Sequence, residues 1–524
     1  MAKIIHHCPT CHKQATTQSE SHIMNTLIMR TYQCGHSEML TVSALSSPDT
    51  LDITSLDNKK LFPFQLVGAQ FLEKSNGRAL LADGMGLGKT VQFIAYIVAH
   101  PEVRPCVLFV KSGLRIQWHK ECVRWGDLMC QVIEGGKTYF LPGMDCYIIS
   151  MDSAWRIESL SSKLKGLQVK TVLIDECQGI KNGNARRTQA IRLCTSGVDH
   201  VIGLSGTPIK NNASEYFPIL NTLRPDKFPS ERQFIYGWCD SYYNGYGTKT
   251  GGLREPKRFL EFTKDFILRR EREDVLPDLP RIFRQYSFHE LGSLVEDAYT
   301  QTVREFQDFY SAADKSSFAT QSSVIAYLSK MRHLTGIAKV SPICDYVSDF
   351  LTSTERKIVI FIHHKDVGQA LYTKLSGIIK ENPSMGSGVL EITSSMDAYQ
   401  RDNTVMKLLS PDYRVAIMST LAAGEGLNLQ PISDCIIGER QWNPPNEEQA
   451  EARFPRPGST ADKINATYFI AVGTVDEFFT DLVEKKREIL NSTLKGEAIP
   501  WNETNLIREL AEVIAQKGGQ KWGF

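Results

Sequence analysis

A glycine-rich segment at residues 83–90, DGMGLGKT, constrains the fold of this 524-residue chain more than any other feature. An apolar run, ALLA at 79–82, precedes it, and an amphipathic stretch beginning at Val91 follows it. A glycine turn between a strand and a helix lets backbone N–H groups close around a phosphate, and the helix N-terminus adds a favourable dipole. The segment therefore predicts a strand–loop–helix unit that binds the phosphates of a nucleotide.

Apolar runs of strand length recur on both sides of a long middle segment, and longer amphipathic stretches separate them. Such alternation is typical of a parallel sheet covered by helices, so we expect an α/β protein with two such sheets. The runs are ALLA at 79–82, VLFV at 107–110, YIIS at 147–150, VLID at 172–175 and VIGL at 201–204, then IVIFI at 358–362, VLEI at 389–392, VAIM at 415–418, CII at 435–437 and TYFI at 467–470.

The middle segment at 213–345 has a mostly helical pattern and contains SYYNGYGTKTGGLREP at 241–256, a Gly- and Tyr-rich stretch that we interpret as a mobile loop. The domain boundaries follow from these shifts in pattern. We predict a zinc-ribbon-like segment at 1–40, a linker at 41–60, a first α/β domain at 61–212, a helical insertion and joint at 213–345, a second α/β domain at 346–490, and a C-terminal helix and tail at 491–524.

Two acidic residues complete the predicted nucleotide site. Lys89 is expected to reach the β- and γ-phosphates, and the hydroxyl of Thr90 is expected to hold Mg²⁺. Asp175 and Glu176 follow the apolar run at 172–174, at the strand end where a parallel sheet presents ligand groups. We expect Asp175 to hold Mg²⁺ through water and Glu176 to polarise the attacking water, with ATP as the nucleotide.

Bulk composition excludes few function classes. The net charge is only +1, so any polyanion site must be a local groove lined by Lys and Arg. No apolar run is long enough for a membrane span, and no secretory signal pattern opens the chain. Twelve cysteines without such a signal favour reduced thiols, so we expect an intracellular protein with no membrane partner, cytoplasmic if it comes from a prokaryote or virus.

The order of the motifs resembles the SWI/SNF-type ATPases of helicase superfamily 2 over roughly residues 60–490. The segments that carry the resemblance are LFPFQLVGAQFL at 61–72, DGMGLGKT at 83–90, VLFVKSGLRIQWHKE at 107–121, DECQGIKN at 175–182, LSGTPIKNN at 204–212, FILRREREDVLPDLP at 266–280, MSTLAAGEGLNLQ at 418–430 and WNPPNEEQAEARFPRPGS at 442–459.

The resemblance implies two RecA-like domains with helical insertions and a motor that moves on duplex DNA without sequence preference. It places Gln65 at the adenine and the loop residues Asp83, Gly84, Met85, Gly86, Leu87 and Gly88 around the phosphates. It gives Gln178 a position in the catalytic motif where His is more usual. It also implies DNA contacts at Lys111, Thr207, His363, Ser419 and Thr420.

The last motif is expected to supply charge to the transition state from the second domain. Arg453 and Arg456 are spaced so that a helix turn could aim both guanidinium groups at one nucleotide, and Gln449 is placed near the same site. The motif departs from the family at Ala452, where Gly is usual, and at Pro455. Proline removes backbone donors and restricts the chain, so Arg453 is the stronger candidate.

Cysteine and histidine residues near the N-terminus have the spacing of a metal site. Cys8 and Cys11 form a CxxC knuckle, and Cys34 and His36 form a second, CGH knuckle, which together offer a tetrahedral Zn²⁺ set. His6, His7 and His12 are rival ligands. The segment at 28–42 is expected to form a hairpin around the second knuckle, and the ribbon could contact DNA, bind a protein or brace the first domain.

Three interpretations of the function remain open at this level. The first is an ATP-dependent DNA translocase that remodels or displaces bound proteins or DNA structures. The second is a strand-separating or annealing helicase with the same core. The third is a nucleotide-gated DNA-binding module with impaired turnover, which the altered last motif motivates. Two further features have competing interpretations: Arg269, Arg270 and Arg272 as DNA contacts or a solvated face, and Trp118 and Trp125 as packing residues or base-stacking residues.

Overall fold

The computed structural model describes residues 61–494 with short gaps, residues 510–516, and the backbone of four strands between residues 5 and 41. The gaps are at 136–137, 209–212, 244–247, 278, 314–317, 394, 421–426, 428, 442–443, 457–458 and 460. The chain divides into two compact units. Unit 1 comprises Met1–Pro208, Tyr216–Ser230 and Glu261–Val275, and unit 2 comprises Ile209–Glu215, Glu231–Leu260 and Leu276–Phe524.

Unit 1 contains a seven-stranded sheet in the order β13-β5-β10-β9-β6-β8-β7, and every pairing in it is parallel. The five strands predicted for the first domain are all present. The strands are β5 (Arg78–Leu81), β6 (Cys106–Val110), β7 (Cys130–Ile133), β8 (Cys146–Ser150), β9 (Thr171–Ile174), β10 (His200–Leu204) and β13 (Ile267–Leu268).

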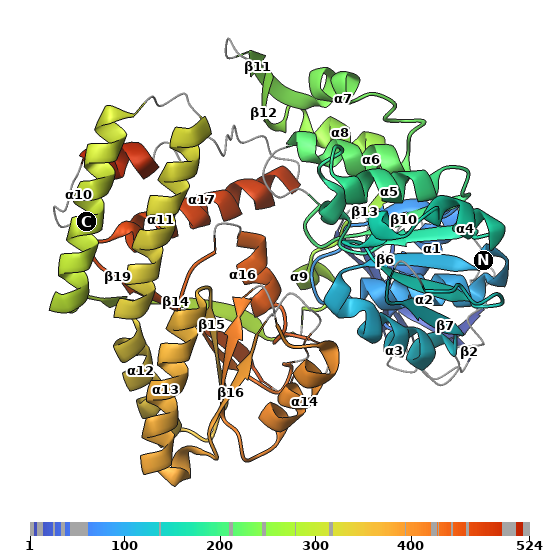
Figure 1. Cartoon of the computed structure of the whole chain (residues 1–524). Helices are drawn as coiled ribbons and strands as arrows, with labels where there is room; N and C mark the ends of the chain where they lie inside the picture. The colour runs from blue at the N-terminus through green and yellow to red at the C-terminus, as the bar shows by residue number, and fades with distance from the viewer. Residues whose placement is uncertain are drawn as a thin grey trace. The chain divides into compact units, whose positions relative to one another are not determined.

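Helices cover both faces of this sheet, with α2 and α3 on one face and α5 and α6 on the other (Figure 1). The α2–α3 face holds one apolar core, to which Phe93 of α2, Trp118 of α3 and Leu108 of β6 contribute. The helices are α1 (Pro63–Lys74), α2 (Lys89–Ala99), α3 (Arg115–Gly126), α4 (Leu160–Gly166), α5 (Arg186–Thr195), α6 (Phe217–Leu223) and α9 (Arg272–Val275).

Unit 2 contains a second parallel sheet, in the order β14-β19-β18-β15-β17-β16. The strand β15 is fully buried, and its alternate residues belong to two apolar cores. Val359 and Phe361 pack on one face of the sheet. Ile358, Ile360 and Ile362 pack on the other face. All five predicted strands are present. The strands are β14 (Arg281–His289), β15 (Ile358–Ile362), β16 (Val389–Ile392), β17 (Val415–Ser419), β18 (Asp434–Ile437) and β19 (Lys463–Ala471).

Helices α12, α13, α14 and α16 pack on that sheet, and α10 and α11 belong to a further apolar cluster. Aromatic residues of α10, including Phe306, pack there with Leu328 of α11 and Leu510 from the C-terminal segment. The helices are α7 (Glu231–Trp238), α8 (Pro256–Thr263, which crosses into unit 1), α10 (Ser293–Ala312), α11 (Phe318–Ala338), α12 (Val340–Ser353), α13 (Lys365–Glu381), α14 (Ala398–Leu409), α16 (Pro444–Glu451) and α17 (Val475–Leu494).

Two stretches of the middle segment differ from the expectation. The stretch at 241–256, interpreted as a mobile loop, contributes to an antiparallel hairpin of β11 (Cys239–Tyr243) and β12 (Thr248–Leu253). Tyr and Thr favour strands, so the composition of the stretch agrees with a strand pair. Residues 281–289 form β14, an edge strand whose last five residues, QYSFH, alternate polar and apolar side chains as is typical of a strand.

The N-terminal region has an antiparallel sheet of β1 (Ile5–His7), β2 (Gln14–Met24), β3 (Leu27–Tyr32) and β4 (Ser37–Thr41). Pairing of β3 with β4 confirms the hairpin predicted at 28–42. The predicted zinc ligands Cys8, Cys11, Cys34 and His36 lie outside the described residues. Among the described helices, none has the length and apolar character needed to cross a membrane.

Candidate active site

The phosphate loop joins β5 to α2, as the sequence predicts. Gly88 occupies the left-handed region with φ of 70°, which glycine adopts without strain, and Lys89 begins α2 directly after it. Nζ of Lys89 donates to the carbonyl oxygens of Asp83 at 2.8 Å and Gly84 at 3.2 Å. Burial lowers the pKa of Lys89, while Glu176, Asp83 and Asp175 oppose that shift. The lysine is therefore held over the loop, next to the acidic pair.

The side chain of Asp83 points into the protein. It is fully buried and accepts hydrogen bonds from Nε of Arg270 at 3.0 Å and from Nε2 of Gln92 at 3.1 Å. Arg270 follows β13, so this ion pair ties an edge strand to the phosphate loop. The carboxylate of Asp83 therefore stabilises the loop, and only its backbone is left to contact a phosphate. The sequence did not predict the ion pair with Arg270.

The acidic pair lies after β9, on the carboxyl edge of the sheet that also carries the phosphate loop. Oδ2 of Asp175 accepts a 2.8 Å hydrogen bond from the indole of Trp118, and Oδ1 accepts one of 3.0 Å from the N–H of Glu176. Burial raises the pKa of Asp175 to about 6, and the charge of Glu176 adds to the shift. Hydrogen bonding by Trp118 and the charges of Lys111 and Lys89 act in the opposite direction.

Trp118 is a packing residue and also a partner of the active site. It is 3% exposed and makes an edge contact with Phe93 of α2, with ring centroids 6.2 Å apart. The prediction that it packs is therefore confirmed. Its hydrogen bond to Asp175 has no local signal in the sequence, because 57 residues separate the two.

A chain of hydrogen bonds runs from Glu176 to the loop after β10. Nε2 of Gln178 donates to Glu176, Oγ of Ser205 donates to Oε1 of Gln178 at 2.7 Å, and the N–H of Thr207 donates to Oγ of Ser205 at 3.0 Å. A Cβ at Gly206 would lie 2.7 Å from Cγ of Met85 and 3.6 Å from Nζ of Lys89. The loop after β10 therefore contacts the phosphate loop and the acidic pair together.

Gln65 lies beside the phosphate loop. Its Oε1 accepts a 3.0 Å hydrogen bond from the N–H of Phe62 at the start of α1. A Cβ at Gly88 would lie 2.4 Å from Nε2 of Gln65, so α1 and the loop pack closely here. The position agrees with the expected neighbourhood of a nucleotide, and the adenine contact itself stays a prediction.

The arginine cluster beside β13 has interactions within the protein. Arg270 is buried with Asp83, as described above. Arg269 donates to the carbonyl oxygens of Ala82 and Gly206 and pairs with Glu271 at 2.7 Å. Arg272 pairs with the exposed Glu273 at 3.1 Å. These contacts hold the segment after β13 against the phosphate loop, which favours a structural role for the cluster over DNA contact.

The DNA-contact candidates of unit 2 have unequal exposure. Thr420 is 1% exposed, and its hydroxyl donates to the carbonyl of Ile362 at 3.1 Å, so it ties β17 to β15. Ser419 ends β17 and is half-buried. Glu439 accepts a 2.7 Å hydrogen bond from the N–H of His363. Burial, followed by the charges of Arg332 and His364, lowers the pKa of the His363 imidazole.

The last predicted motif is anchored by buried ion pairs. Glu447 of α16 is fully buried and accepts from Arg440 at 2.8 Å and from Arg487 at 3.0 Å. Glu451, at the end of the same helix, pairs with Arg284 of β14. Gln449 lies between these acids and is also buried. The sequence of α16 does not predict these three arginine partners, because they come from other parts of the chain.

Arg453 and Arg456 lie after α16, so the expected helix turn carrying both is not formed. The helix ends at Glu451, and Pro455 explains why, since a residue before proline is disfavoured in the helical region. The carbonyl of Arg453 accepts from the N–H of Leu429 at 3.3 Å. Nε of Arg456 donates to the carbonyl of Ala452 at 3.3 Å. Arg456 is therefore turned back toward its own segment.

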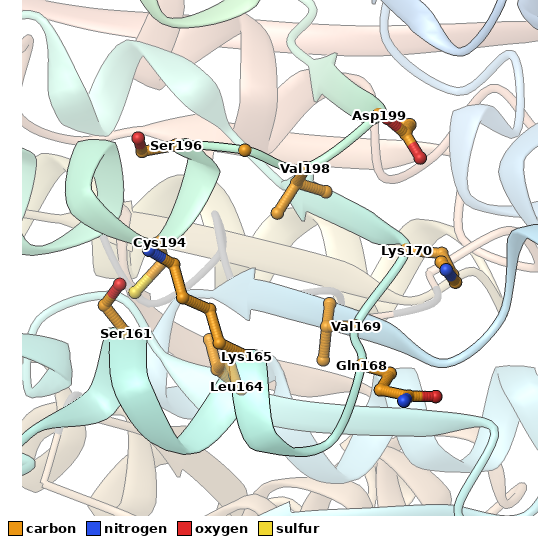
Figure 2. Close-up of a pocket in the computed structure, with 11 residues that line it drawn as sticks. Ser161, Leu164, Lys165, Gln168, Val169, Lys170, Cys194, Ser196, Val198 and Asp199 are labelled. Atoms are coloured by element: carbon orange, nitrogen blue, oxygen red, sulfur yellow. The ribbon is translucent and has the colours of Figure 1, made fainter.

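Unit 1 has a pocket of about 310 Å³ at the amino ends of its strands (Figure 2). Its lining includes Lys170, which precedes β9, and Asp199, which precedes β10. Leu164 and Lys165 of α4 also line it. Lys89 and Asp175 lie at the carboxyl edge of the same sheet. The pocket is therefore not the predicted nucleotide site.

Two parallel α/β units, one with a phosphate loop and an acidic pair on a common sheet edge, define a P-loop protein with two RecA-like domains. Family models agree with this class: an SNF2-related domain matches residues 49–337, and a helicase conserved C-terminal domain matches residues 338–458. The chain belongs to the SNF2 family, which confirms the resemblance stated from the motifs.

Similar proteins include the DNA annealing helicase and endonuclease ZRANB3 of Mus musculus, which is 27% identical over 497 residues, with 92% of this chain and 44% of that protein covered. The SWI/SNF-related matrix-associated actin-dependent regulator of chromatin subfamily A-like protein 1 of Bos taurus is 29% identical, with 89% and 48% covered. The chain thus spans less than half the length of these two relatives. A Sulfolobus solfataricus SWI2/SNF2 ATPase core in complex with dsDNA is 21% identical, with a TM-score of 0.41 and coverage of 91% of this chain and 100% of that chain.

Proposed function

We propose that this protein hydrolyses ATP to translocate on duplex DNA. The observation that carries the proposal is the loop after β10. Gly206 packs on the phosphate loop, and Thr207 is linked through Ser205 and Gln178 to Glu176. This loop contacts both the phosphate loop and the acidic pair. A change of nucleotide can therefore shift the loop and any residue on it that contacts DNA. Membership of the SNF2 family and the names of the two relatives support DNA as the track.

Each residue of the site has a role in this proposal. Lys89 binds the β- and γ-phosphates, and Thr90 and Asp175 would hold Mg²⁺, which neutralises charge on the phosphates when bound. The fit to a cation is supported at Asp175, where two hydrogen-bond donors orient the carboxylate and two lysines favour its ionised form. Glu176 orients and polarises the attacking water.

The DNA contacts in the proposal are Lys111, Thr207, His363 and Ser419. Thr420 is left out because its hydroxyl is buried and bonded. Lys111 follows β6 and also acts electrostatically on Asp175, so it lies close to the nucleotide side of unit 1. Contacts of this kind reach phosphates and carry no base sequence, which agrees with movement along DNA of any sequence.

Steady-state ATPase assays with single-stranded, duplex and branched DNA and RNA test the proposal. We expect hydrolysis to rise with duplex DNA and to be lost in Lys89→Ala and Glu176→Gln. Lys257→Ala, at an exposed lysine of α8, is the matched control and should retain the DNA-stimulated rate. A triplex-displacement assay then measures translocation directly. ATP hydrolysis that is indifferent to every nucleic acid would contradict the proposal.

A second candidate function is strand annealing, and the printed name of the ZRANB3 relative favours it. Fork-unwinding and annealing assays run beside triplex displacement separate the two. Displacement without unwinding or annealing supports translocation alone. Binding of ATP and DNA without turnover in the wild-type protein would instead indicate a nucleotide-gated binding module.

We also propose that Cys8, Cys11, Cys34 and His36 hold one Zn²⁺ and that the N-terminal ribbon serves as a contact for DNA or for a protein partner. The proposal rests on the spacing of the ligands and on the paired strands β1–β2 and β3–β4 that flank the two knuckles. The zinc content of the full chain, compared with that of Cys8→Ala/Cys11→Ala, tests whether these residues bind zinc. The DNA affinity of the same variant tests whether the ribbon contacts DNA.

A further inference from the structure

Four cysteines of unit 1 meet at the amino ends of neighbouring strands, far along the sheet from the ATP site. Cys106 opens β6, Cys146 opens β8 and Cys130 opens β7. Cys146 is the direct register partner of both other strand cysteines. Register partners on parallel strands point to the same face of a sheet, so their three side chains form a row. Cys122 of α3 covers that face.

The thiols are close enough to share one ion. The Sγ atoms of Cys122, Cys130 and Cys146 all lie within 4.8 Å of one another. A tetrahedral zinc site with Zn–S bonds of about 2.3 Å needs sulfurs about 3.8 Å apart, so contraction by about an ångström or less completes the triangle. Cys106 stands beside Cys146 in the row, but its thiol is not one of these three and donates to the carbonyl oxygen of Val103 at 3.7 Å.

The acid beside the cluster has partners of its own. Asp145 directly precedes Cys146 and is engaged by Arg104 at 3.0 Å and by the N–H of Met129 at 2.9 Å. The thiols are therefore the groups left to bind an ion here.

Burial distinguishes this cluster from a reactive surface thiol. Cys106, Cys122 and Cys146 are fully buried, whereas Cys130 is half-buried and offers a path for an ion to enter. Nine cysteines of the described chain are free, and the others in unit 1 do not share this arrangement: Cys194, for example, has a pKa raised to about 12 by burial alone.

From this geometry we propose that Cys122, Cys130 and Cys146 bind a thiophilic metal ion of the Zn²⁺ class. Binding deprotonates the coordinating thiols and releases those protons to solvent, without any change in oxidation state. The site joins α3 to the edge of the sheet. Cys122 lies one helical turn after Trp118 on α3, so an occupied site would also steady the helix that holds Asp175.

Metal analysis of the full chain tests the proposal, and the N-terminal ribbon must be removed as a second source of zinc. The background is therefore Cys8→Ala/Cys11→Ala, purified under reducing conditions with zinc and without a polyhistidine tag. We expect a single zinc ion per chain in this background and loss of that ion on adding Cys122→Ala or Cys130→Ala. Cys194→Ala is the matched control, a buried cysteine of α5 in the same unit, and should keep the ion.

Cobalt substitution supplies a spectroscopic readout. We expect a sulfur-to-cobalt charge-transfer band and intense d–d bands typical of tetrahedral coordination, both lost in Cys130→Ala. Cys130→Ala removes a half-buried side chain at an edge strand, so it guards against the case in which Cys122→Ala unfolds; circular dichroism monitors both. A Cys8→Ala/Cys11→Ala background that retains no zinc, or mass spectrometry that finds a disulfide within the cluster under the same conditions, would overturn the proposal.

Discussion

The indole N–H of Trp118 donates a 2.8 Å hydrogen bond to Oδ2 of Asp175 across 57 residues of sequence. The bond favours the ionised carboxylate, while burial raises the pKa of Asp175 to about 6. Because the folded pKa lies above the ordinary value of 3.8, the native state binds more protons than the unfolded chain between those two values. This carboxyl therefore lowers the free energy of unfolding as pH rises through that window, and it is ionised for catalysis only above it.

We predict that Trp118→Phe moves the acidic limb of the ATPase pH profile upward from about 6. The expected shift is about one pH unit, since a hydrogen bond to a charged group contributes about 1.5 kcal/mol and one pKa unit corresponds to about 1.4 kcal/mol. Profiles of kcat measure it. Trp125→Phe is the control, because that indole bonds Glu121 on the same helix. An unchanged limb in Trp118→Phe would exclude this tuning of Asp175.

We predict that Gln178→Ala reduces the stimulation of hydrolysis by duplex DNA on the order of tenfold, as expected for losing hydrogen bonds worth about 1.4 kcal/mol. The link from Glu176 to Ser205 and Thr207 is broken in this variant, while the phosphate loop is untouched. Nucleotide affinity, measured by fluorescence titration, should stay near the wild-type value. Gln189→Ala, at an exposed position of α5, is the control. Equal loss of ATP affinity and DNA stimulation would argue against a coupling role.

We predict that Arg270→Ala destabilises unit 1 by about 3–5 kcal/mol, because it leaves the fully buried Asp83 without its ion-pair partner. Urea unfolding followed by circular dichroism measures the change in the transition assigned to unit 1. Arg272→Ala breaks only the pair with exposed Glu273 and should cost less than about 1 kcal/mol. Similar costs for the two variants would show that Asp83 is solvated or paired elsewhere.

We predict that Arg453→Ala and Arg456→Ala have unequal effects on hydrolysis. If Arg453 supplies charge to the transition state, kcat falls by about a thousandfold, as for other arginines in that role. Arg456 donates to the carbonyl of Ala452, so its loss should change kcat by less than about tenfold. Single-turnover ATPase rates with saturating DNA compare the two. Equal and large losses of kcat in the two variants would indicate that Arg456 also acts in catalysis.

The sequence by itself determined the two parallel sheets, because buried strands and the phosphate loop have local signals: ten apolar runs and one glycine turn identified ten of the described strands and the Lys89 site. It did not identify β7 or β13, whose few residues carry little periodicity, and it interpreted the β11–β12 hairpin as a loop.

Only the tertiary structure decided which polar groups meet. Asp83 is paired with Arg270 across 187 residues, Trp118 reaches Asp175, and four cysteines from three strands and a helix converge on one face. Local patterns report which face of an element is apolar, whereas the partner of a buried charge or thiol depends on strand order and register. Those are set by packing over the whole chain, so only the folded structure shows the ion pair that fixes the phosphate loop, the hydrogen bond that acts on the pKa of Asp175 and the thiols of the candidate metal site.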